Sequence, residues 1–277
     1  TDSEDLLRYF LDAKRIEGRS EKTVERYRYL LTRLAEETRV PFRKMTVYHI
    51  RNYYTKERER GISSSTLEGY RSVYSSFFGW LSREGLISQN PMVNLTAIKQ
   101  PKVVRKPYSA VELAKIEEAA KNPRDRALIA FLASPGCRVS EACSVNRDDI
   151  NFQEQRLTVT GKGDKQRIVY LDDVTMMLLR RYLDQRTDDN PALFIGKGCR
   201  RLEPGGVRRA LKQIGAAADV DNVHPHRFRR TRATSLIDKG MPIQEVATIL
   251  GHDKLDTTLR YVFIDERNVA EAFRRYA

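Results

Sequence analysis

No run of apolar residues in this chain of 277 residues approaches the roughly 18 that a membrane-spanning helix needs, and no signal peptide opens it. The three cysteines are odd in number and lack the paired spacing of a zinc site, which argues against both a disulfide framework and bound zinc. A G-x-x-x-x-G-K-[ST] loop is also missing, so no ATP site is indicated. These absences predict a soluble cytoplasmic protein without a metal, nucleotide or membrane partner.

Positive charge, by contrast, is abundant. The formal net charge is +13, and 31% of the residues are charged. A strong excess of positive charge in a globular protein is typical of proteins that bind a polyanion, most often nucleic acid. The alternative is a basic surface with no specific partner. The distribution favours nucleic acid, because residues 197–232 hold ten basic and three acidic side chains.

The first 98 residues carry apolar side chains at helical spacing in four segments, which begin near Ser3, Ser20, Thr46 and Ser64. This pattern predicts an all-α unit of four helices, with most of its tyrosines and phenylalanines in the core. Arginines on these helices are candidates for phosphate contacts: Arg26, Arg28, Arg33 and Arg71.

Residues 99–107 contain two prolines, four cations and no acid, a composition typical of an extended linker near a phosphate backbone. Lys102, Arg105 and Lys106 are its candidate DNA contacts. We therefore place the domain boundary in this segment.

Residues 108–277 mix helical and β patterns. Two alternating runs, Arg156–Thr160 and Gln166–Tyr170, flank a glycine-rich tip and predict a hairpin. The short apolar run 192–195 is a candidate third strand. The sequence thus predicts a mainly α protein of two domains, the second being α+β with a small three-stranded antiparallel sheet.

The residues suited to phosphate chemistry concentrate in the last quarter of the chain. His224, His226 and His252 lie there, and Tyr261 follows them. His226 and Arg229 are three residues apart, which places them on one face of a helix. Two cations lie upstream: Arg138 after a Ser-Pro-Gly turn, and Lys162 between two glycines of the hairpin. Arginines can bind phosphate oxygens, and a phenol can attack phosphorus.

In this order and spacing the motifs resemble those of the tyrosine recombinases, or phage integrase family. The motifs are Gly136-Cys-Arg-Val-Ser-Glu141, the hairpin Gly-Lys162-Gly, His226-Arg-Phe-Arg229, Leu-Gly-His252 and Thr-Thr-Leu-Arg-Tyr261. The resemblance covers essentially the whole chain. One departure is Ser134-Pro135, where the family commonly has a Thr-Gly type of approach to the arginine.

The resemblance implies a helical core-binding domain (1–98), a basic linker (99–107) and a catalytic domain (108–277). It also implies a site-specific DNA recombinase that forms a 3′-phosphotyrosine bond and a Holliday junction without metal or ATP. Tyr261 is then the nucleophile, His226 the proton-transfer residue and Lys162 the general acid for the leaving 5′-oxygen.

The remaining roles concern the phosphate oxygens. Arg138 and Arg229 would stabilise the two non-bridging oxygens, and His252 would add a hydrogen bond to them. Glu141 would orient a neighbouring cation. His224 is left as a structural residue.

The family also implies a C-shaped clamp around double-stranded DNA, a homotetramer on two recombination sites, possible accessory proteins and association with the nucleoid. Further DNA-binding candidates follow from the basic helices: Arg208, Arg209, Arg230 and Arg232. We expect the tail, 263–277, to pack on a neighbouring protomer.

Several alternatives stay open. Integration or excision of a mobile element competes with resolution of dimers or cointegrates. The lack of an additional arm-binding domain favours a simple recombinase, unless the chain is truncated, as the missing initiator methionine permits. A nicking-only enzyme, related in chemistry to the type IB topoisomerases, and a catalytically silent DNA-binding protein of the same fold are the other candidates.

Overall fold

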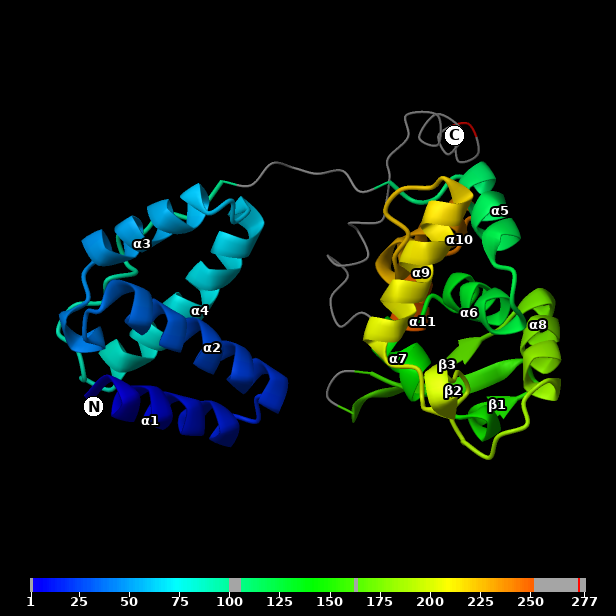
Figure 1. Cartoon of the computed structure of the whole chain (residues 1–277), viewed down its shortest axis with the longest axis horizontal. Helices are drawn as coiled ribbons and strands as arrows, with labels where there is room; N and C mark the ends of the chain where they lie inside the picture. The colour runs from blue at the N-terminus through cyan, green and yellow to red at the C-terminus, as the bar shows by residue number, and fades with distance from the viewer. Residues whose placement is uncertain (1, 100–105, 162–163, 252–273, 275–277) are drawn as a thin grey trace. The chain divides into compact units, whose positions relative to one another are not determined.

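The computed structural model describes residues 2–99, 106–161, 164–251 and 274 (Figure 1). The chain divides into two compact units, Thr1–Val103 and Val104–Ala277. This division falls within the segment predicted as a linker, most of which lies outside the described residues. None of the helices within the described ranges is both long and apolar enough to cross a membrane.

The described part of the first unit is helical. Its α-helices are α1 (Asp2–Ile16), α2 (Glu21–Thr38), α3 (Val47–Glu59) and α4 (Ser64–Arg83), and a 3₁₀ turn, η1 (Phe42–Lys44), precedes α3. Helix α2 contacts the other three helices, and α3 also packs on α4. The predicted four-helix unit is confirmed.

Aromatic side chains fill the core of this unit, as predicted. The rings of Phe10 and Phe42 meet the ring of Phe77 edge to face, with centroids 5.1 and 4.7 Å apart. Such pairs each contribute about 0.5–1.5 kcal/mol beyond the burial of their area. The exceptions are exposed tyrosines: Tyr9, Tyr29 and Tyr48. Helical periodicity therefore located the core, because α-helices bury one stripe of side chains.

A buried carboxylate connects α2 to α3. Glu57 is fully buried and accepts hydrogen bonds from Arg33 at 2.6 Å and from Arg60 at 2.8 Å. Arg33 also donates to the hydroxyl of Tyr70 at 3.3 Å. Arg33 is thus part of the structural framework of this unit.

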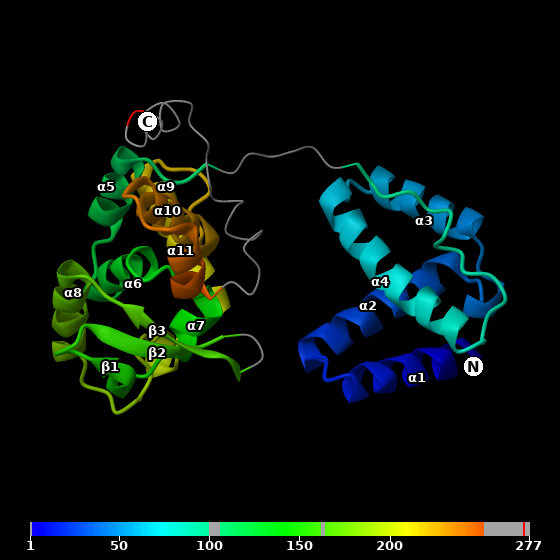
Figure 2. The same cartoon turned by 180° about the vertical axis from the view of Figure 1, so that it is seen from behind.

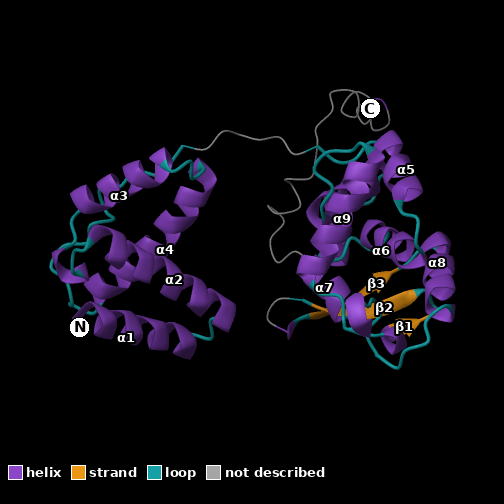
Figure 3. Cartoon of the chain, in the orientation of Figure 1, coloured by secondary structure: helices purple, strands orange, loops and turns teal. Residues whose placement is uncertain are grey.

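The second unit contains a small sheet surrounded by helices (Figure 3). Before the sheet come α5 (Ala110–Ala119), α6 (Pro123–Ala133), α7 (Val139–Ser144) and the 3₁₀ turn η2 (Arg147–Asp149). After it come α8 (Asp173–Asp184), the 3₁₀ turn η4 (Lys197–Cys199), α9 (Pro204–Ala218), α10 (Pro225–Asp238) and α11 (Ile243–Leu250). Helix α10 packs against α6 and α11, and α11 also contacts the sheet at β3 (Figure 2).

The sheet has the antiparallel order β1-β2-β3, formed by Ile150–Asn151, Arg156–Thr160 and Gln166–Tyr170. The predicted hairpin is confirmed, and so is the fold class: mainly helical, two units, one small three-stranded antiparallel sheet. The identity of the third strand was predicted wrongly. It is the two-residue strand β1, which is too short to show an alternating pattern.

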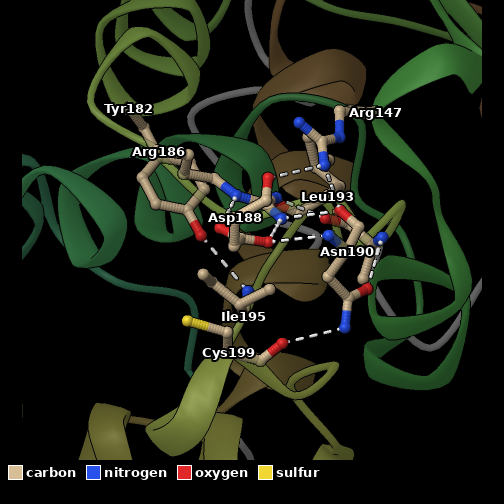
Figure 4. A network of polar contacts seen from close by, with 9 residues as sticks. Arg147, Tyr182, Arg186, Asp188, Asn190, Leu193, Ile195 and Cys199 are labelled. Atoms are coloured by element: carbon tan, nitrogen blue, oxygen red, sulfur yellow. Dashed lines mark hydrogen bonds and ion pairs between the residues drawn. The ribbon is translucent and has the colours of Figure 1, made fainter.

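Residues 192–194 are buried and Ile195 is partly buried, but the run 192–195 does not form a strand of the sheet. Ala192 and Ile195 make only isolated bridges, to Asn146 and Arg201. The segment is held by a polar network around Arg186, which donates to Asp188 and to the carbonyl of Leu193 (Figure 4). Since an apolar run indicates burial and not strand pairing, the sequence pattern alone misassigned it.

Candidate active site

Arg138 lies at the turn between α6 and α7. Gly136 has a φ of +65°, and Arg138 is the N-cap residue of α7. Glu141, three residues on, accepts the backbone N–H of Arg138 at 2.8 Å. The departure from the family pattern at Ser134-Pro135 does not disturb this arrangement, in which the Arg138 side chain remains one-third exposed.

The carboxylate of Glu141 is the centre of the cluster. Its side chain is 2% exposed and accepts from the guanidinium groups of Arg138, at 2.8 Å, and Arg167, at 2.8 and 2.7 Å. Burial alone would raise the pKa of this carboxyl, but the hydrogen bonds from Arg167 and then Arg138 outweigh it and hold the pKa at about 2. Glu141 is therefore a fixed negative charge between two cations.

Arg167 was missed in the sequence. It lies on β3 opposite Val159, on the strand face that also buries Val169. A cation on the buried face of a strand needs a partner of opposite charge. An arginine at this position of the strand was therefore the sequence feature that could have indicated a site residue. It was ambiguous, because Ile168 and Tyr170 make the opposite, exposed face appear equally apolar.

Arg229 comes from α10 and is 2% exposed. Its Nη1 donates to the carbonyl oxygen of Gly136 at 2.8 Å, and its Nη2 donates to that of Leu250 at 2.5 Å. Arg229 thus links α10 to the turn before Arg138 and to the end of α11.

The three arginines converge on the C-terminus of α11. Arg167 donates to the carbonyl of Ile249 at 2.9 Å, and Arg138 donates to that of Gly251 at 2.9 Å. With Arg229 on Leu250, three consecutive carbonyls at this helix end each receive one guanidinium group. Cations are favoured there, because the last carbonyls of a helix carry partial negative charge.

The two histidines of α10 have different environments. His226 is exposed in the first turn of the helix, three residues before Arg229. His224 is the N-cap residue, and its Nδ1 accepts the backbone N–H of Arg227 at 3.3 Å. This bond gives His224 a structural role, in keeping with its exclusion from the predicted site.

Some predicted residues lie outside the described ranges: Lys162, His252 and Tyr261 of the site, Lys102 and Arg105 of the linker, and the tail at 263–277, apart from residue 274. Gly251 is the last described residue before His252. The arginine cluster therefore lies directly where the chain continues toward His252 and Tyr261.

The DNA-binding candidates occupy different environments. Arg26 and Arg28 on α2, Arg208 and Arg209 on α9, and Lys106 are exposed, whereas Arg230 and Arg232 on α10 are half-buried. Arg33 pairs with Glu57, and Arg71 forms a bidentate pair with Glu68. Of these candidates, Arg232 lies beside the turn that leads to Arg138, since a Cβ added at Gly136 would lie 3.5 Å from its Cγ.

Gly251 leaves no room for a side chain beside this cluster. It has a φ of +65°, and a Cβ there would lie 2.9 Å from Cδ and 3.0 Å from Nε of Arg167. We expect Gly251→Ala to reduce the free energy of unfolding by about 2–3 kcal/mol, of which about 1–2 kcal/mol comes from the left-handed backbone. Urea unfolding measures the loss.

Gly240→Ala is the matched control. Gly240 has a φ of +87° with nothing within 4 Å of the added Cβ, so it should show only the backbone contribution. Equal losses in the two variants would contradict close packing of Arg167 on Gly251.

Comparison with known proteins identifies the family of this chain. Residues 108–267 match the model of the phage integrase family, and residues 6–87 match that of the phage integrase N-terminal SAM-like domain. The chain is 32% identical over 275 residues to tyrosine recombinase XerA of Pyrococcus horikoshii, which covers 98% of this chain and 93% of the relative. It is 31% identical over 245 residues to tyrosine recombinase XerC of Alcanivorax borkumensis, covering 84% and 80%.

Solved structures show the same fold. A crystal structure of XerA recombinase matches 99% of this chain and 98% of its own, with 26% identity and a TM-score of 0.57. The Tn1549 transposon integrase, in complex with a circular intermediate DNA, matches 98% and 99% with a TM-score of 0.78 and 17% identity. The family model spans over half of the chain and XerA nearly all of it, so the chain belongs to the phage integrase family and is a tyrosine recombinase.

Proposed function

We propose that this protein cleaves and rejoins double-stranded DNA at specific sites through a covalent bond between Tyr261 and a 3′-phosphate. The observation that carries the proposal is the convergence of Arg138, Arg167 and Arg229 on the last three carbonyls before His252. This convergence brings the two predicted phosphate-binding arginines, which are distant in the sequence, to the point where the chain continues toward the predicted nucleophile.

In the proposed reaction the Tyr261 oxygen attacks the scissile phosphorus, and the bond to the 5′-oxygen breaks. His226 takes the phenolic proton, and Lys162 protonates the leaving 5′-oxygen, so a free 5′-hydroxyl remains. Rejoining follows when a 5′-hydroxyl attacks the phosphotyrosine. The energy of the phosphodiester is retained in the covalent intermediate, which is consistent with a reaction that consumes no ATP.

Arg138 and Arg229 act on the non-bridging oxygens, with His252 as a further donor. Arg138 is the more accessible of the two arginines, and Glu141 accepts a hydrogen bond from its guanidinium group at 2.8 Å. Donors fixed before the reaction stabilise developing charge without reorganisation, and the loss of one typically reduces the rate by about 10²–10³-fold.

Duplex DNA is the proposed partner, and the exposed basic residues of α2, α9 and the linker are its proposed contacts. Recombination requires two sites, so we propose a homotetramer on two duplexes that passes through a Holliday junction, with accessory proteins in some reactions. Such a protein acts at the nucleoid, in the cytoplasm. Integration or excision and resolution of dimers remain alternative outcomes of the same chemistry.

A nicked suicide duplex tests the proposal. When the fragment released with the free 5′-hydroxyl is short enough to diffuse away, rejoining fails and the covalent adduct accumulates. The probe is the DNA flanking the gene, and mass spectrometry of the digested adduct should place the nucleotide on the peptide with Tyr261. DNA binding without any adduct would instead indicate a catalytically silent protein, and nicking without strand exchange would indicate a relaxing enzyme.

A further inference from the structure

The segment at the C-terminal end of the linker is fastened to the first turns of α10. The backbone N–H of Tyr108 donates to Thr231 Oγ1 at 2.8 Å, and the Tyr108 hydroxyl accepts the backbone N–H of His224 at 3.1 Å. Tyr108 is 5% exposed, and its ring centroid lies 4.9 Å from that of Phe228. Tyr108 thus contacts the N-cap residue through its hydroxyl, Phe228 through its ring and Thr231 through its backbone N–H.

Arg227 completes the attachment from the side of the helix. Its guanidinium group lies 4.1 Å from the centroid of the Tyr108 ring. Its Nε donates to the carbonyl of Lys106 at 3.2 Å, and its Nη2 donates to Glu112 Oε1 at 2.7 Å and to the carbonyl of Pro107 at 3.4 Å. A planar guanidinium group can stack on a ring and donate in several directions at once, which an ammonium group cannot do.

The Arg227 side chain donates its hydrogen bonds to other groups of this chain. It is 15% exposed, and its Nη1 donates to the carbonyl of Asp221 at 2.9 Å, in the loop before α10. Arg227 therefore joins three segments: the end of the linker, the start of α5 and the loop that leads into α10. It directly follows His226 in the sequence.

We propose that Arg227 and Tyr108 are positioning residues for His226, and that through them the end of the linker sets the orientation of the first turn of α10. This inference rests on the proposed role of His226 in proton transfer. The backbone of His226 lies between two attached points, the N-cap His224 on Tyr108 and Arg227 on Lys106. A displacement of the linker end is thereby transmitted to His226.

The kinetic test compares Arg227→Ala with the native chain on the nicked suicide duplex. The rate of adduct formation at saturating DNA should fall about 10- to 100-fold, because small misplacements of a reacting group have effects of this size. The DNA concentration at half-maximal rate should stay near its native value. Arg227→Lys keeps the charge and should restore the rate only in part, since it cannot stack and donate in the same geometry.

Arg147→Ala is the matched control. Arg147 also donates to loop carbonyls, those of Asp188 and Asn190, but neither belongs to α10 or to the linker (Figure 4). Its adduct rate should remain close to the native rate. A fall in Arg227→Ala seen only as weaker DNA binding, or an equal fall in Arg147→Ala, would overturn the positioning role.

Amide hydrogen exchange in the absence of DNA provides a readout that does not depend on catalysis. Peptides covering 106–112 and 222–231 should exchange faster in Arg227→Ala, because the Tyr108 ring and the carbonyls of Lys106 and Pro107 lose the guanidinium group that holds them in place. In Arg147→Ala their exchange should be unchanged. Unchanged exchange in both peptides overturns the attachment. If the native chain forms no adduct, the proposed function fails, while the exchange result still decides whether Arg227 fastens the linker end to α10.

Discussion

Replacing Tyr261 by phenylalanine should abolish the covalent protein–DNA adduct while leaving DNA binding close to the native level. The substitution removes one hydroxyl oxygen, which is the proposed nucleophile, and retains the aromatic ring. Because the proposed attacking oxygen is absent, the loss should be complete within the sensitivity of a denaturing gel. A binding assay on the same duplex provides the second measurement.

Tyr170→Phe is the matched control for this substitution. Tyr170 is an exposed tyrosine at the end of β3, 58% accessible, with no part in the proposed chemistry. Its adduct yield should equal that of the native chain. A native-like adduct from Tyr261→Phe would refute the assignment of the nucleophile.

Replacing Glu141 by glutamine should destabilise the second unit and reduce cleavage together. The substitution leaves Arg138 and Arg167 without the buried charge that they share, and it places an amide N–H₂ group against one of them. Removal of one member of a buried ion pair typically reduces the free energy of unfolding by about 3–5 kcal/mol. With Arg138 released, we expect a fall in adduct rate of about 10²-fold, as for other misplaced transition-state donors.

Glu154→Gln is the control for charge alone. Glu154 pairs with Arg156, but both side chains are exposed, and such pairs contribute only about 0–1 kcal/mol. Urea unfolding of both variants at neutral pH measures the difference. A loss in Glu141→Gln as small as that in Glu154→Gln would contradict the central place of Glu141 in the cluster.

The contribution of Glu141 should depend on pH in a defined direction. Its pKa is about 2 in the folded protein, below the ordinary value of 4.5. A depressed carboxyl pKa stabilises the fold above the unfolded pKa, and this stabilisation is lost as the pH falls through the folded pKa. The difference in unfolding free energy between the native chain and Glu141→Gln should therefore be constant above pH about 5 and shrink between about 4.5 and 2.

The order of helices could be predicted from the sequence because the residues that favour a helix and its ends lie within the helix or next to it. Apolar residues three and four apart marked the helices of the first unit, and Ser20 and Thr46 are the N-cap residues of α2 and α3. The hairpin was equally local, since two alternating runs flanked a glycine-rich tip. The third strand, β1, could not be predicted in this way, because two residues are too few to show the alternation of apolar and polar side chains that is typical of a strand.

Part of the candidate site could likewise be predicted from the sequence, and part could not. The spacing of the motifs was enough to identify the family and to select Arg138, Glu141 and Arg229 as candidates. It could not show that Arg167 shares the carboxylate of Glu141, since the two residues are 26 positions apart and on different elements. Nor could it distinguish Arg33, which is held by the buried Glu57, from the exposed Arg26.

What the sequence by itself determined is the set of chemical groups, their order along the chain and the helices that carry them. Only the tertiary structure decided which groups meet: Arg138 reaches a carbonyl 113 positions away, and Arg167 reaches one 82 positions away. The physical reason is that periodicity and capping act within one or two turns. An ion pair or a helix end, in contrast, receives its partner from whichever element the packing of the core brings beside it.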